Sequence, residues 1–431
     1  MSNDPVAGPR ISRRRFVGGA AGTVGALALG GATALAGKPT AAGLSKVEHV
    51  VVVMMENRSF DHFLGWLPGA DGRQAGLTYY DKAGTPHQTY ALAPDYQGCG
   101  HPDPDHSYEG GRVEFNGGAC DGWLRAGTND EFAIGYYTEQ DLAFFGQAVP
   151  QWTTFSRYFC SILAETYPNR IYQHAAQTDR IRNTSTLCTL PTIWDRLADK
   201  GRTGRYYYGD LPFLALWGAK YQPISRPVAD FFADCAAGTL PDVSYVDPRF
   251  LDEGSGTSGD DHPHADIRNG EAYMDSVYKA VTKSPNWPNT VLVFNYDEWG
   301  GFYEHVAPPT APIPAADQAA GNQDGRLGFR VPCMVVSPFA RRGYITRKAY
   351  DHTSILRMIE SRWGLAPLSI RDQSANNLAE VLDFSRTGLQ APQYNVSAGP
   401  FGAPCGIPTT AVEEDWAGLV SYAQSTGWTI Y

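Results

Sequence analysis

Three apolar runs do most to limit how this chain can fold. They span 50–55 (VVVVMM), 291–296 (VLVFNY) and 331–337 (VPCMVVS). Each is rich in β-branched or bulky apolar residues and lacks the alternation of a strand with one face in water. We therefore expect buried strands of a parallel sheet that is covered on both faces. Shorter strand candidates are 205–208 and 243–246.

Helical periodicity appears between these strands. From 246 to 291 the apolar residues recur at helical spacing, which predicts a βαβ unit; they are Ile267, Tyr273, Met274, Val277, Tyr278 and Val281. Segments 192–200 and 353–363 are predicted amphipathic helices, and each is followed by a glycine that can end it, Gly201 or Gly364. The pattern predicts an α/β sandwich around a mostly parallel sheet.

The composition excludes some classes of protein. The chain has 431 residues, of which 43% are hydrophobic and 19% charged, with a net charge of −10. Such a chain can bury a sizeable core, and its acidic balance lacks the basic footprint of a nucleic-acid-binding protein. Its seven cysteines are too few for a disulfide scaffold. Their odd number leaves at least one unpaired within the chain, and their spacing does not reveal the pairing.

The first residues are typical of an export signal. Residues 12–17 (SRRRFV) carry paired arginines, and 17–36 is uncharged and dominated by Gly and Ala. This layout predicts a twin-arginine signal peptide cleaved after Ala36, which leaves a mature chain of 37–431. A membrane anchor is the alternative, but so much Gly and Ala makes the stretch weakly apolar, so we expect no stable anchor. Removing four arginines and one aspartate takes the net charge from −10 to −13.

The mature chain shows no internal repeat, which favours a single domain. The polar, glycine-rich stretches 81–118 and 310–328 are predicted to be long surface loops. In the tail after 383, Thr410 precedes Glu413 by three residues and predicts a capping box. The helix that it would open carries Trp416, Leu419 and Val420, and we expect it to dock on the domain.

Polar residues follow two of the predicted strands. Glu56 and Asn57 come directly after 50–55, and Asp297 and Glu298 follow 291–296. The carboxyl ends of parallel strands meet at one edge of a sheet, where ligands bind. Carboxylates gathered there repel one another unless they share a cation, and oxygen ligands suit a hard divalent ion such as Ca, Mg, Mn or Zn. Helix capping or pairing with Arg58 is the alternative, and the spacing does not decide between them.

A candidate nucleophile lies in 164–170 (AETYPNR). This segment precedes a predicted helix over 168–177, with Pro168 at its first position. Thr166 then lies at a helix N-terminus, where backbone N–H groups favour an anion, so its hydroxyl could attack a bound phosphate. Asn169 and Arg170 could supply further donors. A plain capping threonine is the commoner role for such a residue.

Five of the ten histidines fall in polar loop or strand-end contexts: His106, His262, His264, His305 and His352. Near a bound phosphate, an imidazole can donate to its oxygens, protonate the leaving group or activate water. A surface or capping role is commoner for any single histidine.

Segment 56–65 (ENRSFDHFLG) resembles the signature of the bacterial phosphoesterase family, which holds secreted phospholipases C and an acid phosphatase branch. Further motifs resemble that family in the same order and extend the resemblance over about 47–365. They are 166–170 (TYPNR), 261–263 (DHP), 270–271 (GE), 296–302 (YDEWGGF), 304–306 (EHV), 308–309 (PP), 328–332 (GFRVP), 337–339 (SPF) and 350–354 (YDHTS).

The resemblance implies a three-layer fold similar to alkaline phosphatases and arylsulfatases, with one divalent metal. The implied metal ligands are Glu56, Asn57, Thr166, Asp297 and Glu298. Thr166 would also be the nucleophile of a double displacement through a phosphothreonine. The implied phosphate-binding or proton-transfer groups are His106, His262 and His305, with further substrate contacts from Asn169, Arg170, His264 and His352.

Three functions are therefore carried forward: an exported phospholipase C-like phosphodiesterase, an acid phosphatase, and a non-catalytic exported phosphoester-binding protein. The threonine nucleophile favours the first. The expected substrate is a small phosphate ester or a phospholipid, and the expected location is secreted, periplasmic or in the cell envelope. Glu165 departs from the small residue or proline that commonly precedes the phospholipase nucleophile, which could alter headgroup preference. The tail also leaves no room for the C-terminal β-domains of larger phospholipases, so we expect weak action on bilayers.

Overall fold

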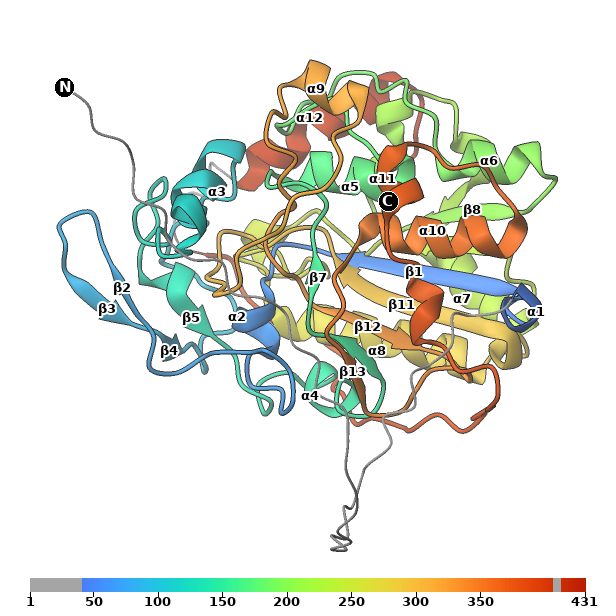
Figure 1. Ribbon diagram of the computed structural model, residues 1–431, viewed down its shortest axis with the longest axis horizontal. Helices are drawn as coiled ribbons and strands as arrows, with labels where there is room; N and C mark the ends of the chain where they lie inside the picture. The colour runs from blue at the N-terminus through green and yellow to red at the C-terminus, as the bar shows by residue number, and fades with distance from the viewer. Residues whose placement is uncertain (1–40, 406–411) are drawn as a thin grey trace, which may run out of the picture. The chain divides into compact units, whose positions relative to one another are not determined.

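A computed structural model describes residues 41–405 and 412–431 (Figure 1). The export signal predicted over 1–36, with its cleavage site, and Thr410 of the predicted capping box lie outside the described residues. The main sheet has eight strands in the order β13-β6-β12-β11-β1-β10-β8-β9. Their bounds are β1 His49–Met55, β6 Thr153–Phe155, β8 Gly204–Tyr208, β9 Ser225–Pro227, β10 Val243–Val246, β11 Thr290–Tyr296, β12 Cys333–Val336 and β13 Tyr344–Thr346.

Strand β1 lies at the centre of the parallel part of the sheet. It pairs in parallel with β10 on one side and with β11 on the other. Its side chains from Val50 to Met55 are all buried, as the apolar run predicts. The register aligns Met55 with Tyr296 and Val53 with Val246, so the residues that follow these three strands emerge at the same edge of the sheet.

Strand β12 differs from the expectation for 331–337. It is buried throughout but runs antiparallel to both neighbours, β11 and β6. The prediction of a parallel strand was wrong here because a continuous apolar run reports burial on both faces. The direction of the strand depends on how the preceding segment returns to the sheet.

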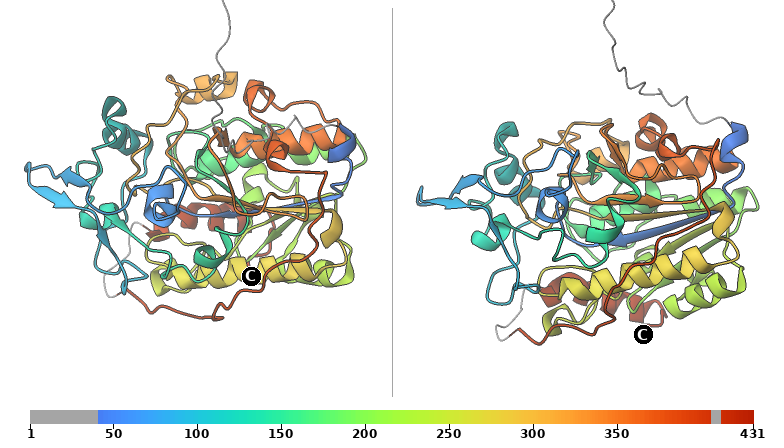
Figure 2. Two further views of the ribbon diagram at one scale, coloured as in Figure 1. Left: turned by 60° about the horizontal axis from the view of Figure 1, so that its bottom comes forward. Right: turned by 90° about the horizontal axis from the view of Figure 1, so that it is seen from below.

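Helices cover both faces of the sheet (Figure 2). Helices α7 (Val228–Ala237) and α8 (Ile267–Lys283) pack together on one face, while α5 (Thr166–Ala175) and α10 (His352–Trp363) pack together on the other. Helix α8 connects β10 to β11 as the predicted βαβ unit requires. Helix α6 (Ile193–Asp199) follows its N-cap Thr192, and α10 ends at Gly364 with φ +64°. The expected mostly parallel α/β sheet between layers of helices is thus confirmed.

The two stretches predicted as loops contain regular elements. Helix α3 (Tyr108–Phe115) lies within 81–118, and α9 (Ala315–Ala320) lies within 310–328. Helix α3 was not predicted from the sequence because it contains two glycines. Their backbone approaches its neighbours so closely that a Cβ on Gly110 would lie 2.3 Å from Asp105, and one on Gly111 would lie 2.9 Å from Leu163.

The remaining elements are short. They are α1 Ala41–Leu44, α2 Phe60–Leu64, β2 Thr78–Tyr80, β3 Pro86–Gln88, β4 Tyr90–Ala91, β5 Gly135–Tyr136, α4 Phe145–Ala148, β7 Tyr158–Phe159, β14 Tyr350–Asp351, α11 Ile370–Ser374, and the 3₁₀ turns η1 Asn116–Gly118, η2 Glu131–Ile134, η3 Phe213–Trp217, η4 Gln222–Ile224, η5 Glu253–Ser255, η6 Trp287–Asn289 and η7 Leu378–Val381.

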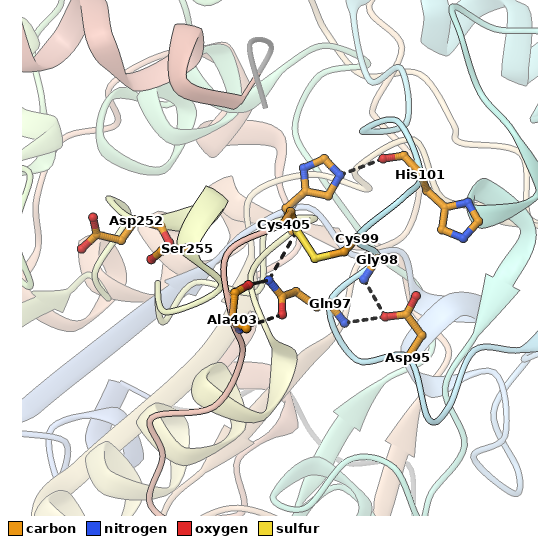
Figure 3. The surroundings of a disulfide bond; sticks show 10 residues. Asp95, Gln97, Gly98, Cys99, His101, Asp252, Ser255, Ala403 and Cys405 are labelled. Carbon is orange, nitrogen blue, oxygen red and sulfur yellow. Dashed lines mark hydrogen bonds between the residues drawn. A yellow bond between two sulfur atoms is a disulfide. The ribbon is translucent and has the colours of Figure 1, made fainter. Parts of the chain in front are cut away.

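The C-terminal tail docks as predicted. Helix α12 (Val412–Ser425) buries Trp416 and Leu419, and the Trp416 ring stacks on Phe250 at 4.8 Å between centroids. Ahead of α12 in the chain, Cys405 forms a disulfide with Cys99 (Figure 3). The other five cysteines are free and buried. Within the described part of the chain, no helix combines the length and the apolar character needed to cross a membrane.

Candidate active site

The ends of β1 and β11 bring four predicted ligands into one buried region. Glu56, Asn57, Asp297 and Glu298 are each fully buried. Asn57 has φ +58°, a left-handed conformation that asparagine tolerates better than most residues. That turn directs its backbone N–H to Asp297 Oδ1 at 3.1 Å. The backbone bond joins the two strand ends.

Thr166 faces this region from the start of α5. The helix begins at Thr166, two residues earlier than predicted, so Pro168 lies at the third position, where its missing N–H still costs no helical bond. The Thr166 hydroxyl donates to Asn57 Oδ1 at 3.4 Å. The residue before it, Glu165, is the N-cap but makes no side-chain capping bond; its carboxylate accepts from the backbone N–H of Asn183.

Arg170 lies one turn further along α5, on the same side of the helix as Thr166. Its Nε is 2.9 Å from Glu56 Oε1 and 3.4 Å from Asp297 Oδ2. Its Nη1 is 3.3 Å from Asp247 Oδ1, and Nη2 donates to the carbonyl of Met54 at 3.2 Å. The guanidinium therefore neutralises part of the charge of carboxylates from three neighbouring strands.

One arginine does not satisfy all of these carboxylates. Glu56 Oε2, Asp297 Oδ2 and Glu298 Oε1 are buried and accept no hydrogen bond from the described residues. Burial raises the pKa of Asp297 to about 6, and it raises the pKa of Glu56 and of Glu298 well above the usual value for Glu. Buried carboxylate oxygens without donors are costly unless a cation meets them. With the amide of Asn57, these oxygens fit a hard divalent ion.

The region contains further acidic residues that sequence reasoning missed. Glu253 and Asp260 each place a carboxylate oxygen within 4.8 Å of one on Glu56, in a group of possible metal ligands. Asp103 forms a second such group with His106 and His262. Asp260 directly precedes the 261–263 motif, and Asp247 follows β10 as Glu56 follows β1. The position of Asp247 directly after a strand could therefore have identified it from the sequence. Asp103 and Glu253 follow no strand directly, so no such signal marked them.

Two predicted histidines line the region with matching ring geometry. The Nδ1 atoms of His106 and His262 lie 2.8 and 3.0 Å from the carbonyls of Pro104 and Pro263. This contact favours hydrogen on Nδ1 and leaves Nε2 as the acceptor. His106 Nε2 is 3.9 Å from Glu298 Oε1, and the two rings are 6.1 Å apart. Burial lowers the pKa of His262 well below its usual value, so its ring is neutral at pH 7.

The other predicted residues make their hydrogen bonds elsewhere. His305 Nδ1 is 2.5 Å from Asp61 Oδ2, His264 Nε2 is 2.9 Å from the His101 carbonyl, and His352 Nε2 is 2.9 Å from the Tyr296 carbonyl. Burial lowers the pKa of His352 to about 4. The side chain of Asn169 binds backbone groups of Ile162, Ala164 and Glu165. The structure brings Thr166 and Arg170 to the strand ends. The roles in substrate binding or proton transfer of His264, His305, His352 and Asn169 remain predictions.

Comparison with known proteins identifies the class. Residues 47–366 match the model of the phosphoesterase family, and the chain belongs to that family. It is therefore a hydrolase that acts on ester bonds.

Curated relatives resemble this chain over most of its length. It is 29% identical to phospholipase C A of Mycobacterium tuberculosis, over 95% of this chain and 91% of the relative. It is 30% identical to non-specific phospholipase C6 of Arabidopsis thaliana, over 80% and 73% of the two chains. The non-hemolytic phospholipase C of Pseudomonas aeruginosa is 30% identical, over 87% of this chain and 64% of that one.

Solved structures give weaker similarity. A phosphonate monoester hydrolase of Agrobacterium radiobacter aligns with a TM-score of 0.38 and 11% identity, over 78% of this chain and 77% of the other. A protein of the alkaline phosphatase superfamily from Vibrio parahaemolyticus aligns with a TM-score of 0.37 and 9% identity, over 89% of both chains. Similarity at this level adds nothing to what the sheet topology establishes.

Proposed function

We propose that this protein is an exported, metal-dependent phosphodiesterase of the phospholipase C type, which acts through a phosphorylated Thr166. The observation that carries the proposal is the position of the Thr166 hydroxyl. It lies at the N-terminus of α5, 3.4 Å from Asn57 Oδ1, beside buried carboxylates with unpartnered oxygens. The phospholipase C relatives support the choice of a diester substrate.

The reaction would proceed in two displacements. Thr166 Oγ attacks phosphorus and loses its proton, the bond from phosphorus to the diacylglycerol oxygen breaks, and that oxygen takes up a proton. Water then attacks phosphorus and loses a proton, the bond to Thr166 Oγ breaks, Thr166 Oγ takes up a proton, and the headgroup phosphate leaves. Backbone N–H groups at the start of α5 can bind the phosphoryl oxygens. His106 and His262 are the proposed proton carriers, since the Pro104 and Pro263 carbonyls contact their Nδ1 atoms, which favours Nε2 as the proton acceptor.

We propose that Glu56, Asn57, Thr166, Asp297 and Glu298 would hold one divalent cation. When bound, such an ion lowers the pKa of a coordinated hydroxyl and offsets negative charge on the phosphoryl group. Arg170 then serves as the permanent counter-ion, since it already contacts Glu56, Asp297 and Asp247. Oxygen donors accept Ca, Mg, Mn or Zn, so elemental analysis of the purified protein is the measurement that names the metal.

We further propose that the protein is exported by the twin-arginine machinery and carries no stable membrane anchor. The paired arginines in 12–17 and the Gly- and Ala-rich stretch after them support this route. The Cys99–Cys405 disulfide supports an oxidising destination, where such bonds persist. N-terminal sequencing of protein recovered from outside the cytoplasm should begin at residue 37.

A two-substrate assay tests the activity. The metal-loaded enzyme should hydrolyse p-nitrophenyl phosphorylcholine faster than p-nitrophenyl phosphate, and a chelator should remove the activity. Thr166→Ala should lower kcat at least about 10³-fold. Thr282→Ala is the matched control, because its hydroxyl bonds only to the Tyr278 carbonyl within α8, and it should keep kcat.

The other outcomes identify the alternatives. Preference for the monoester would make the protein an acid phosphatase. Failure to hydrolyse either ester in a metal-loaded sample would favour a non-catalytic phosphoester-binding protein. Full activity in Thr166→Ala would eliminate the phosphothreonine.

A further inference from the structure

Helix α12 lies outside residues 47–366, which match the family, yet one of its side chains touches three segments that converge on the candidate site. Trp416 is buried, with 4% of its surface exposed. Its ring stacks on Phe250 at 4.8 Å and tilts against Tyr167 at 5.5 Å. Its Nε1 donates to Glu253 Oε1 at 2.9 Å.

Each of these neighbours leads to a residue of the site. Tyr167 is bonded to Thr166 along the chain. Phe250 supports the Arg170 guanidinium, whose Cζ lies 4.5 Å from the ring centroid. Glu253 Oε2 lies 3.5 Å from His262 Nδ1, and its carboxylate lies within 4.8 Å of that of Glu56. Trp416 therefore contacts three residues that are joined to, or pack against, Thr166, Arg170 and His262.

Glu253 is placed to set the state of the His262 ring. A carboxylate beside Nδ1 favours hydrogen on that nitrogen and fixes the ring orientation, which leaves Nε2 able to accept a proton. The charged and titratable groups that also face His262 are His106, His264, Arg58 and Asp103. Among these neighbours, Glu253 is the carboxylate next to Nδ1, while Asp103 Oδ2 lies 3.9 Å from Nε2.

The turn that carries Glu253 is itself held by the tail. The backbone N–H of Cys405 donates to the Gly254 carbonyl at 3.2 Å, and Cys405 is joined to Cys99 (Figure 3). Gln97, two residues before Cys99, accepts at Oε1 from the Ala403 N–H at 3.2 Å. The tail segment that contains Ala403 and Cys405 and the helix α12 thus hold η5 from two sides.

We propose that Trp416 and Glu253 form a positioning pair, through which the C-terminal helix orients His262 and Thr166 for the reaction. The pair is not catalytic, because neither side chain is assigned a contact with the reacting atoms. The proposal rests on the proposed function. It implies that the tail after the family region is part of the working enzyme.

Three variants of the mature, disulfide-bonded protein test it. Trp416→Phe keeps the stacked ring and removes the N–H donor. Glu253→Gln keeps an acceptor for Trp416 and removes the charge beside His262. Trp428→Phe is the matched control: this tryptophan is also buried in the tail, and its Nε1 donates to the Gly218 carbonyl at 2.9 Å, away from the site.

We expect Trp416→Phe and Glu253→Gln each to lower kcat by about tenfold, with KM changed less than about threefold, as for other partners that orient a reacting side chain. The double variant should lose no more than the worse single variant, because both changes break one linkage. Trp428→Phe should leave kcat unchanged while it lowers Tm as much as Trp416→Phe. Equal kcat values in Trp416→Phe and Trp428→Phe would overturn the proposal.

A spectroscopic readout separates this proposal from the proposed function. In ¹⁵N-histidine-labelled protein, the His262 ring, assigned by its disappearance in His262→Asn, should carry hydrogen on Nδ1 in the wild type and in Glu253→Gln, because the Pro263 carbonyl also accepts from it, but its Nδ1 resonance should shift in Glu253→Gln. If the ring changes but neither ester is ever hydrolysed, the positioning pair stands and the proposed function fails. If esters are hydrolysed and the ring stays unchanged, the positioning pair fails alone.

Discussion

Two buried clusters in this protein each combine carboxylates with one arginine and differ in how their hydrogen bonds are completed. The open cluster consists of Glu56, Asp297 and Glu298 with Arg170; the closed cluster consists of Asp61, Glu304 and His305 with Arg330. In the closed cluster each of the four carboxylate oxygens accepts a hydrogen bond. The donors are the backbone N–H groups of Asp61, Arg73, His305 and Val306 and the side chains of Arg330 and His305. In the open cluster one oxygen of each carboxylate accepts none from the described residues.

The difference supports the open cluster as the site of the proposed cation. Arg330 and backbone N–H groups complete the closed cluster, although Asp61, Glu304 and His305 stand close enough to hold a metal. Arg170 completes only part of the open cluster, since it also serves Asp247. Three neighbouring carboxylates that each keep an oxygen without a hydrogen bond therefore distinguish the candidate metal site from the closed cluster. The predictions below are ordered by the size of the expected effect.

Asp297→Asn should have the largest effect on activity. The amide keeps the acceptor for the Asn57 N–H but removes a proposed ligand charge, so kcat should fall at least about 10³-fold. The metal-free variant should be no less stable than the metal-free wild type, because a buried charge is lost. Retention of more than a tenth of wild-type kcat would place the metal elsewhere.

Asp61→Asn is the same change in the closed cluster and should have the opposite signature. Removing one buried carboxylate leaves Arg330 with Glu304 as its remaining partner in the cluster and removes the charge beside His305 Nδ1, so the free energy of unfolding should fall by about 3 kcal/mol. Urea unfolding measures this loss. The kcat of the folded fraction should stay within a few-fold of wild type, and a large fall in kcat at unchanged stability would give the closed cluster a chemical role.

Metal binding should stabilise the protein through the open cluster alone. A divalent ion at 100 times its Kd adds about 2.7 kcal/mol to the free energy of unfolding. Asp297→Asn should abolish the corresponding rise in Tm, and Asp61→Asn should keep it. Calorimetry with and without a chelator measures the rise in Tm in both variants. If Asp61→Asn alone removed this rise, the assignment of the two clusters would be reversed.

A third buried carboxyl has no arginine partner and should give the smallest effect. Glu271 accepts from the N–H groups of Phe144 and Phe145, and burial raises its pKa to about 8. The folded state then binds more protons than the unfolded state between pH 4.5 and 8, so stability declines as pH rises through that window.

Glu271→Gln should lack this decline. The variant should match the wild type near pH 5 and be more stable than the wild type at pH 8, and the gap should widen steadily between these values. Urea unfolding at the two pH values measures the difference. A constant gap at both pH values would show that Glu271 does not titrate in this range.

Much of the fold was predictable from local patterns. The runs at 50–55 and 291–296 became β1 and β11 because burial on both faces requires continuous apolar sequence. The antiparallel direction of β12 and the helix α3 were not predictable, since they depend on chain connection and on the close approach of Gly110 and Gly111 to their neighbours.

The candidate site divides in the same way. Glu56, Asp297 and Thr166 were found because strand ends and helix starts have local signatures. The contacts of Arg170 with three carboxylates, of Glu253 with His262 and of Trp416 with Glu253 join residues far apart in the chain. Spacing along the sequence carries no information about such pairs.

By itself, the sequence determined the buried central strands of the sheet, the motifs that resemble the family and the chemical groups that follow the strand ends. Only the tertiary structure decided which carboxylates an arginine and backbone groups complete and which keep an oxygen without a hydrogen bond. The reason is physical: a hydrogen bond or ion pair depends on distances of a few ångströms between atoms from different segments. Local sequence fixes the conformation of each segment, whereas packing of the segments fixes those distances.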